Sequence, residues 1–170
     1  MRSLVAAIAA ALLLAPAASA HTDSPRQIAF SWPAQGIVTT TFGPQLDGRF
    51  HPGLDIGVLT SLTVTASAAG TVVAVGAPPG FEGYGNVVLV DLGGGLEALY
   101  AHLASSSVEP GDVVESAQTL GVAGCTGWCT GTHLHFELRS DGVAFDPLPL
   151  LPPQAGPPPQ GDLAPERRAA

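Results

Sequence analysis

The sequence predicts an all-β domain built mainly of antiparallel strands. Short runs rich in valine and threonine are separated by glycine and proline, of which there are 21 and 16 among the 170 residues. Runs of this length, bounded by residues that favour turns, are typical of antiparallel sheets. No convincing amphipathic helix follows the first twenty residues.

Seven strand-like runs follow one another along the chain, at 37–42, 62–66, 71–75, 86–91, 96–102, 112–114 and 132–138. Three consecutive glycines at 93–95 separate two of these runs and predict a tight hairpin, because glycine readily adopts the positive φ that such turns need. Segments 68–76 and 109–121 each pair a glycine turn with a Val-Val strand, which suggests repeated hairpin elements.

The two ends of the chain differ in composition from its middle. Residues 1–20 combine an early arginine, an apolar run and small residues at Ala18 and Ala20, the pattern of a secretory signal peptide. Cleavage near Ala20 is expected to leave a secreted or cell-envelope protein without a membrane span, and an uncleaved anchor is the alternative. We expect a short lead at 21–29, one domain at 30–150, and a proline-rich disordered tail at 151–170.

The charge of the chain excludes one class of partner. Without Arg2 the exported chain has five arginines, no lysine and fourteen acidic residues, a formal net charge of −9. Nucleic-acid binding needs clustered basic residues that neutralise phosphates, so no nucleic-acid partner is expected. The remaining length of roughly 150 residues suits one domain with its own core, and a monomer is the expected state.

Cys125 and Cys129 are the only cysteines, and they lie four residues apart in GCTGWCTG. In an exported protein such a pair predicts a disulfide, here one that stiffens the loop before His133. The closed loop is short, so chain-entropy arguments assign it only about 2 kcal/mol. A zinc site made by the two thiolates and the nearby histidines is the competing interpretation.

Three short motifs contain four of the five histidines: HPGLD with His51 and Asp55, YAHL with His102, and HLHFE with His133 and His135. Side chains at i and i+2 of a strand point to the same face, so one metal ion can contact both histidines of HLHFE. Imidazole nitrogen and carboxylate oxygen are preferred ligands of catalytic zinc, which usually keeps three protein ligands and an open position. The motifs therefore predict a metal-dependent hydrolase.

Four segments resemble, in order and spacing, the LytM or lysostaphin type of zinc metallopeptidases: HPGLD at 51–55, GYGNVVLVDLGGGLEALYAHL at 83–103, EPGDVVESAQTLG at 109–121 and TGTHLHFELR at 130–139. The resemblance covers residues 30–150. It implies a single-domain antiparallel β-sheet or sandwich of the duplicated hybrid motif type, with an active-site groove. It also implies a zinc endopeptidase whose partners are peptidoglycan peptides, cut in the cross-bridge or the stem. Ala117 stands where the family commonly has glycine, which does not affect a ligand position.

The resemblance also implies a division of roles. His51, Asp55 and His135 correspond to the ligands of one zinc ion per chain, and His102 and His133 to catalytic residues beside it. Either of these two histidines can accept a proton and pass it to the leaving amine, or stabilise the oxyanion. On the residues alone, Glu137 is expected to share the strand face of His135, where it either orients a metal ligand from the second coordination shell or is an ordinary strand carboxylate.

Three other functions are compatible with parts of the sequence. A non-catalytic regulator on the same fold, which binds the wall or activates an amidase, would be expected to lack a ligand, and this chain has all of them. A covalent carrier of the biotinyl type, suggested by 109–121, needs a lysine that the chain does not have. A sugar-phosphotransfer domain would need a cytosolic phosphate donor, which an exported protein does not meet.

Overall fold

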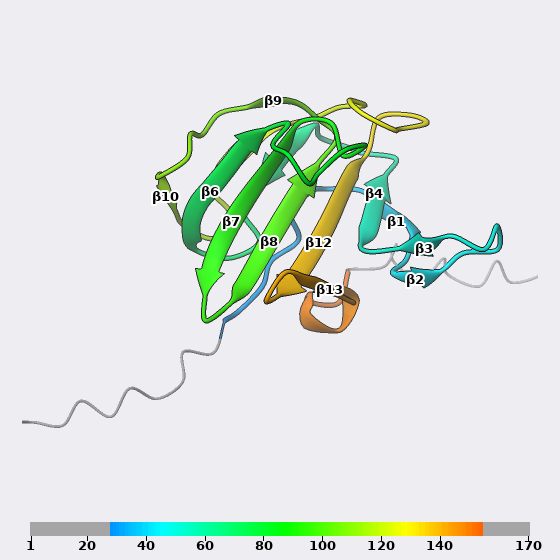
Figure 1. Cartoon of the computed structure of the whole chain (residues 1–170), viewed down its shortest axis with the longest axis horizontal. Helices are drawn as coiled ribbons and strands as arrows, with labels where there is room; N and C mark the ends of the chain where they lie inside the picture. The colour runs from blue at the N-terminus through cyan, green and yellow to red at the C-terminus, as the bar shows by residue number, and fades with distance from the viewer. Residues whose placement is uncertain (1–27, 155–170) are drawn as a thin grey trace, which may run out of the picture.

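The computed structural model describes residues 28–154, which form one large sheet and two smaller ones (Figure 1). The large sheet has the strand order β1-β4-β12-β8-β7-β6-β10, and β13 also pairs with β12. The bounds are β1 Ile37–Thr40, β4 Leu54–Gly57, β6 Gly70–Gly76, β7 Val87–Gly93, β8 Leu96–Ala101, β10 Val113–Val114, β12 Leu134–Ser140 and β13 Val143–Phe145.

A three-stranded sheet and a two-stranded hairpin complete the described part of the chain. The three-stranded sheet has the order β5-β11-β9, with bounds Thr63–Thr65, Thr119–Ala123 and Leu103–Ser106. The hairpin joins β2 (Gly43–Pro44) to β3 (Phe50–His51), and a 3₁₀ helix covers Leu148–Leu150. Every pairing between these strands is antiparallel. The predicted all-β antiparallel fold is confirmed, and nothing helical in 28–154 has the length and apolarity to cross a membrane.

The main core lies between the large sheet and the three-stranded sheet. Alternation along each strand sends one set of side chains inward: Ile56 of β4, Tyr100 of β8 and Phe136 of β12 are fully buried in it. Val64 of β5 and Leu120 of β11 face them from the smaller sheet. On the opposite face of the large sheet, Leu99 and Ala101 of β8 belong to a second apolar cluster, while β4 and β12 carry polar groups.

The predicted hairpin at the triple glycine is present between β7 and β8. Gly94 and Gly95 form its two-residue turn with φ of 66° and 80°, as a turn that follows the strand twist requires. The two similar segments also meet, because β10 pairs with β6 through Val113 opposite Thr71. Ala117 has a φ of 65°, which explains in backbone terms why glycine suits this position in the family.

The described residues extend past the expected domain end at 150. Leu151 is buried, and the carbonyl of Pro152 accepts a hydrogen bond of 2.8 Å from the indole of Trp32. The predicted signal segment 1–20, most of the lead and residues 155–170 of the predicted tail lie outside the described residues.

Candidate functional site

The predicted site residues gather on the face of the large sheet that points away from the main core. Along β12, Leu134 and Phe136 face the core, while His135 and Glu137 face the other side. In the register of the sheet His135 lies opposite Asp55 of β4 on one side and Ala101 of β8 on the other. The antiparallel pairing of β4 with β12 therefore joins two motifs that are 80 residues apart in sequence.

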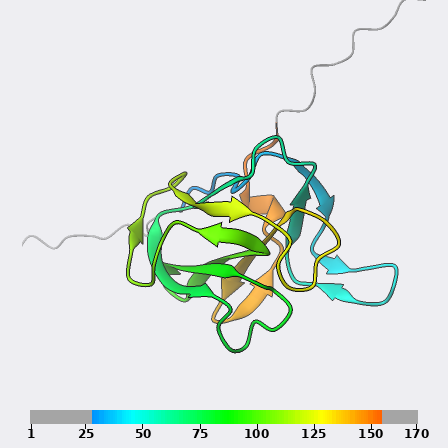
Figure 2. The ribbon, with the colours of Figure 1, turned by 90° about the horizontal axis from the view of Figure 1, so that it is seen from above.

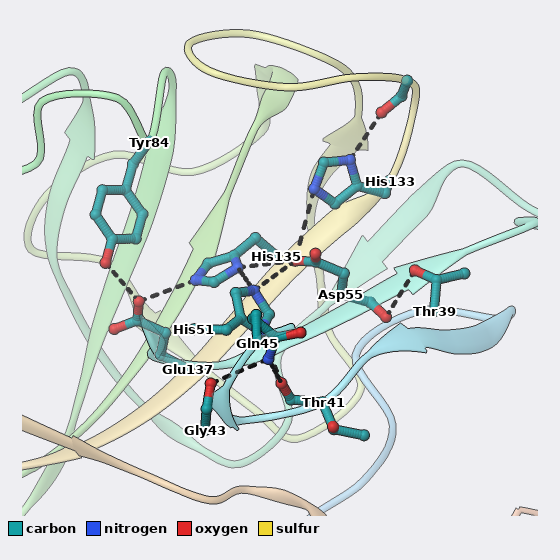
Figure 3. Close-up of polar contacts among 11 residues, drawn as sticks. Thr39, Thr41, Gly43, Gln45, His51, Asp55, Tyr84, His133, His135 and Glu137 are labelled. Carbon is teal, nitrogen blue, oxygen red and sulfur yellow. Dashed lines mark hydrogen bonds and ion pairs between the residues drawn. The ribbon is translucent and has the colours of Figure 1, made fainter. Parts of the chain in front are cut away.

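Three donor atoms converge at this point (Figure 3). His51 Nε2 lies 3.1 Å from Asp55 Oδ1 and 3.1 Å from His135 Nδ1, and the latter two atoms are 2.9 Å apart. Ligands placed tetrahedrally at 2.0–2.1 Å from zinc are separated by about 3.3 Å. Both the spacing and the donor types fit a metal ion, so His51, Asp55 and His135 form a group that could hold one.

Hydrogen bonds on the far side of each ring direct a lone pair toward the centre. His51 Nδ1 donates to the carbonyl of Thr41 at 3.0 Å, which leaves Nε2 unprotonated on the side of Asp55. Gln45 donates to the same carbonyl at 3.0 Å and so helps to fix it (Figure 3). A carbonyl can only accept, so the tautomer of this imidazole is set by the backbone.

His135 is oriented the other way round, with Nδ1 toward the centre. Its Nε2 lies 2.9 Å from Oε1 of Glu137, a fully buried carboxylate that also accepts a 2.6 Å hydrogen bond from the Tyr84 hydroxyl. A carboxylate behind a ligating histidine fixes its ring and raises its basicity. Arg139 lies 3.1 Å from the other oxygen of Glu137 and over the ring of Phe81.

His102 and His133 lie beside the three donors, with ring centres 4.8 Å apart. His102 Nδ1 donates to the carbonyl of Thr126 at 2.8 Å, and His133 Nδ1 donates to that of Gly131 at 2.7 Å. Both rings thus keep an Nε2 with a free lone pair, and that of His133 is 3.6 Å from Asp55 Oδ1. His102 has a φ of 61°, so the chain turns there from β8 into β9.

The surroundings shift the pKa values of several of these groups. Burial raises the pKa of the Asp55 carboxyl, but its close polar and charge interactions with His135 and His51 outweigh burial and hold that pKa far below its usual range. Burial lowers the pKa of His135, yet its bonds to Asp55 and Glu137 leave it raised overall. Burial is also the main cause of the lowered pKa of His102, which favours a neutral imidazole there.

The loop between β11 and β12 encloses one side of the site. Cys125 and Cys129 are joined by a disulfide within it, as predicted from the sequence. Thr126 of this loop accepts a hydrogen bond from the Asn86 amide and donates one to the Leu103 carbonyl, each 2.9 Å long. The loop is thereby attached to the segments that precede β7 and begin β9.

A cleft of about 650 Å³ opens over the five predicted site residues. One wall is the β2–β3 hairpin with Arg49 and Phe50, and the other carries Tyr84 and Trp128. In both Figure 1 and Figure 2 this hairpin (cyan) and the β11–β12 loop (yellow) lie at the same end of the molecule. Such a cleft can admit an extended peptide.

The five site residues predicted from the sequence lie together in the fold. Several groups that support them were not predicted. Tyr84, which holds Glu137, was not predicted, although its place between two glycines in GYG was a usable signal. The carbonyls of Thr41, Thr126 and Gly131 leave no trace in the sequence, because every residue type provides this acceptor.

Comparison with known proteins identifies relatives of this fold and site. Over 105 residues the chain is 37% identical to the DD-carboxypeptidase/endopeptidase Mpg of Neisseria meningitidis serogroup B, covering 62% of this chain and 24% of Mpg. It is 33% identical over 137 residues to the murein hydrolase activator NlpD of Salmonella dublin, covering 81% of this chain and 35% of NlpD. The chain thus spans about a quarter to a third of the length of these relatives.

A solved structure and a family model agree with these relatives. The catalytic domain of the antimicrobial peptidase lysostaphin from Staphylococcus simulans superposes with a TM-score of 0.59 at 30% identity, over 67% of this chain and 90% of that domain. The model of peptidase family M23 matches residues 49–147, which include all five predicted site residues. The chain belongs to peptidase family M23.

Proposed function

We propose that this protein is a zinc metalloendopeptidase that hydrolyses peptide bonds in bacterial peptidoglycan, in the cross-bridge or the stem peptide. The convergence of the His51, Asp55 and His135 donor atoms to within 2.9–3.1 Å of one another carries the proposal. Mixed nitrogen and oxygen ligands are those of catalytic zinc in hydrolases. When bound, zinc supplies the Lewis acidity that activates water and polarises a carbonyl.

The residues around this group have the properties that peptide hydrolysis needs. His102 is neutral and presents a free Nε2, so it can accept a proton from the attacking water and return it to the leaving amine. His133, which presents Nε2 from the other side, can stabilise the developing oxyanion when protonated, or exchange roles with His102. Glu137 holds the ring of His135 in place.

The same proposal includes export of the protein from the cytoplasm. Peptidoglycan lies outside the cytoplasm, and the signal-like residues 1–20 and the cysteine pair both suit an extracytoplasmic compartment. We propose cleavage near Ala20, a metallopeptidase domain that runs from residue 30 through the packed Leu151 and Pro152 and acts as a monomer, and a tail beyond residue 154 that is not needed for hydrolysis.

A second function is supported by the similarity to NlpD over 81% of this chain. In this version the chain binds peptidoglycan or an amidase and stimulates hydrolysis by another enzyme. The full set of donors and proton-handling histidines favours the peptidase, because a regulator does not need them.

The test compares purified protein spanning 21–170 with three variants on isolated peptidoglycan. We expect about one zinc per chain and release of new amino termini, identified by mass spectrometry of defined muropeptides. Asp55→Ala should lose both zinc and hydrolysis, whereas His102→Ala should retain zinc and lose at least about a hundredfold in kcat. Glu109→Ala removes an exposed carboxylate outside the cleft and should change neither property.

Zinc binding without hydrolysis of several wall types would contradict the peptidase. Stimulation of a purified amidase by that same preparation would establish the regulator in its place.

A further inference from the structure

The disulfide lies in the one segment that supports both histidines beside the donor group. The backbone of the β11–β12 loop provides the carbonyl of Thr126 to His102 and that of Gly131 to His133. Cys125 directly precedes the first of these carbonyls, and Cys129 is two residues before the second. Both tautomers therefore depend on the conformation of a single loop.

Besides the disulfide, noncovalent contacts hold this loop between its ends, among them a 3.5 Å hydrogen bond from the Thr126 amide to the His102 carbonyl. At its base, His133 and Gly124 form an isolated β-bridge, and in its middle the Trp128 amide donates to the Gly83 carbonyl at 2.7 Å. The Thr126 hydroxyl adds the two hydrogen bonds described above. The residues from Cys125 to Gly131 belong to no strand, so the disulfide is the only covalent constraint on their path within 28–154.

The three proposed ligands are not positioned by this loop. His51 is fixed by Thr41 beside the β2–β3 hairpin, and His135 by Glu137 within β12. Asp55 lies in β4, which is paired on both sides with β1 and β12. The donor group and the two neighbouring histidines are thus supported by separate parts of the fold.

We propose that the Cys125–Cys129 disulfide is a redox switch of turnover, whose reduction loosens His102 and His133 while the metal stays bound. This inference rests on the proposed peptidase function. Cys125 is exposed and Cys129 half-buried, so a dithiol reductant can reach the bond. A reductant thiolate attacks one cysteine sulfur, which forms a mixed disulfide and releases the other cysteine; the second reductant thiol then attacks the reductant sulfur of the mixed disulfide and releases the first cysteine. Two electrons and two protons pass from the dithiol, which becomes a disulfide, to Cys125 and Cys129.

The experiment compares zinc-loaded protein before and after reduction with dithiothreitol, together with the Cys125→Ser/Cys129→Ser variant. Because dithiothreitol binds zinc, metal content is measured on the variant, which needs no reductant. We expect the variant to keep one zinc and its circular dichroism spectrum, and to lose at least about tenfold in kcat through misplacement of the two rings. Wild-type protein should lose kcat on reduction and regain it on reoxidation, while dithiothreitol should not change the rate of the variant.

A second measurement reports the tautomers of His102 and His133 directly. In ¹⁵N spectra of the histidine side chains, oxidised protein should show His102 and His133 as single tautomers protonated on Nδ1, and the variant should show both tautomers in exchange. Equal kcat and unchanged tautomers in the variant would overturn the switch, and so would loss of zinc. If oxidised protein does not hydrolyse peptidoglycan at all, the peptidase proposal fails, and the spectra still decide whether the disulfide orders the two rings.

Discussion

At the scale of single residues, the site is organised by what lies behind each imidazole. Three of its four histidines donate Nδ1–H to a backbone carbonyl, namely those of Thr41, Thr126 and Gly131, and present Nε2 to the centre. His135 alone is backed by a carboxylate, that of Glu137. An anion behind the ring strengthens it as a donor, whereas a neutral carbonyl leaves the ring free to change its protonation. The carboxylate therefore suits His135 for metal binding, and the lowered pKa of His102 suits it for proton transfer. His51, backed by a carbonyl, is a candidate ligand because its Nε2 lies 3.1 Å from both Asp55 Oδ1 and His135 Nδ1.

Gly53 offers a test of how closely the ligands are packed. A Cβ at this position would collide with the Phe136 carbonyl and lie 2.9 Å from Glu137 Cγ and 3.1 Å from His135 Cε1. Gly53→Ala should therefore push β12 away, weaken zinc binding at least about tenfold and destabilise the fold by about 1–3 kcal/mol. Zinc titration and thermal denaturation measure these two effects.

The matched control for this substitution is Gly131→Ala, where the added Cβ meets no atom within 4 Å. Its free energy of unfolding and zinc affinity should stay close to those of wild type. If both variants bound zinc and unfolded alike, the close approach of Gly53 to β12 would not be required for zinc binding or stability.

At the scale of elements, the strands supply the donors and the loops supply the walls of the cleft. Trp128 projects from the β11–β12 loop with 85% of its surface exposed, yet its ring packs directly against Gly83. The backbone amide of Trp128 donates a hydrogen bond to the Gly83 carbonyl, and the disulfide joins the residues on either side of Trp128 in the loop. An aromatic side chain held this firmly loses little conformational entropy when a substrate covers it.

Replacement of Trp128 by alanine should accordingly raise KM about tenfold, which corresponds to about 1.4 kcal/mol, with little change in kcat. The reason is that Trp128 lines the cleft away from the donor group, so we expect its indole to bind ground state and transition state alike. Steady-state kinetics on soluble muropeptides separate the two constants. Val143→Ala removes an exposed apolar side chain outside the cleft and should leave KM unchanged; a fall in kcat alone for Trp128→Ala would contradict the assignment.

The sequence predicted those strands whose own residues favour the extended conformation. It did not predict those strands that form through pairing with their neighbours in the sheet. Runs dense in valine and threonine became β6 and β7, the HLHFE run of alternating polar and apolar residues became β12, and the triple glycine became the β7–β8 turn. Six strands of two to five residues were not predicted, namely β2, β3, β4, β9, β11 and β13, because runs this short give little local pattern. Such segments become strands through their neighbours in the sheet, which a local pattern does not contain.

At the scale of the whole molecule, the large sheet and the three-stranded sheet must keep their relative positions for the cleft to keep its shape. Tyr100 of β8 is fully buried, and its hydroxyl accepts a 2.7 Å hydrogen bond from the amide of Ser67, in the connection from β5 to β6. The Ser67 hydroxyl lies 2.9 Å from the same oxygen, and burial raises the pKa of Tyr100 to about 12. This contact ties the smaller sheet to the larger one inside the core.

Tyr100→Phe should lower the free energy of unfolding by about 1–3 kcal/mol, because it leaves the buried Ser67 amide without an acceptor. Ser67→Ala removes only the hydroxyl and keeps that amide bonded, so it should lower stability by less. Urea denaturation of both variants measures the difference. A Tyr100→Phe variant as stable as Ser67→Ala would mean that the amide finds another partner.

Metal removal should affect the stability of the whole domain as well as its chemistry. The donor group joins β4, β12 and the end of the β2–β3 hairpin, so an ion bound there favours the folded state over the unfolded one. At a free zinc concentration of about one hundred times Kd the gain is about 2.7 kcal/mol, which for a domain of this size raises Tm by about 10 °C. Scanning calorimetry with and without a chelator measures the shift, and Asp55→Ala, which lacks one donor, should show almost none.

The same shift should shrink as the pH falls. In the metal-free protein the pKa of His135 is raised, so its ring holds a proton at higher pH than an ordinary histidine. Zinc must displace that proton, and its apparent affinity therefore declines as the pH drops through the raised pKa. The Tm difference between zinc-loaded and chelated protein should be larger at pH 8 than at pH 6, and proton release on zinc binding should be detectable by calorimetry in buffers of different ionisation enthalpy. A Tm difference independent of pH would place the ion on groups other than His135.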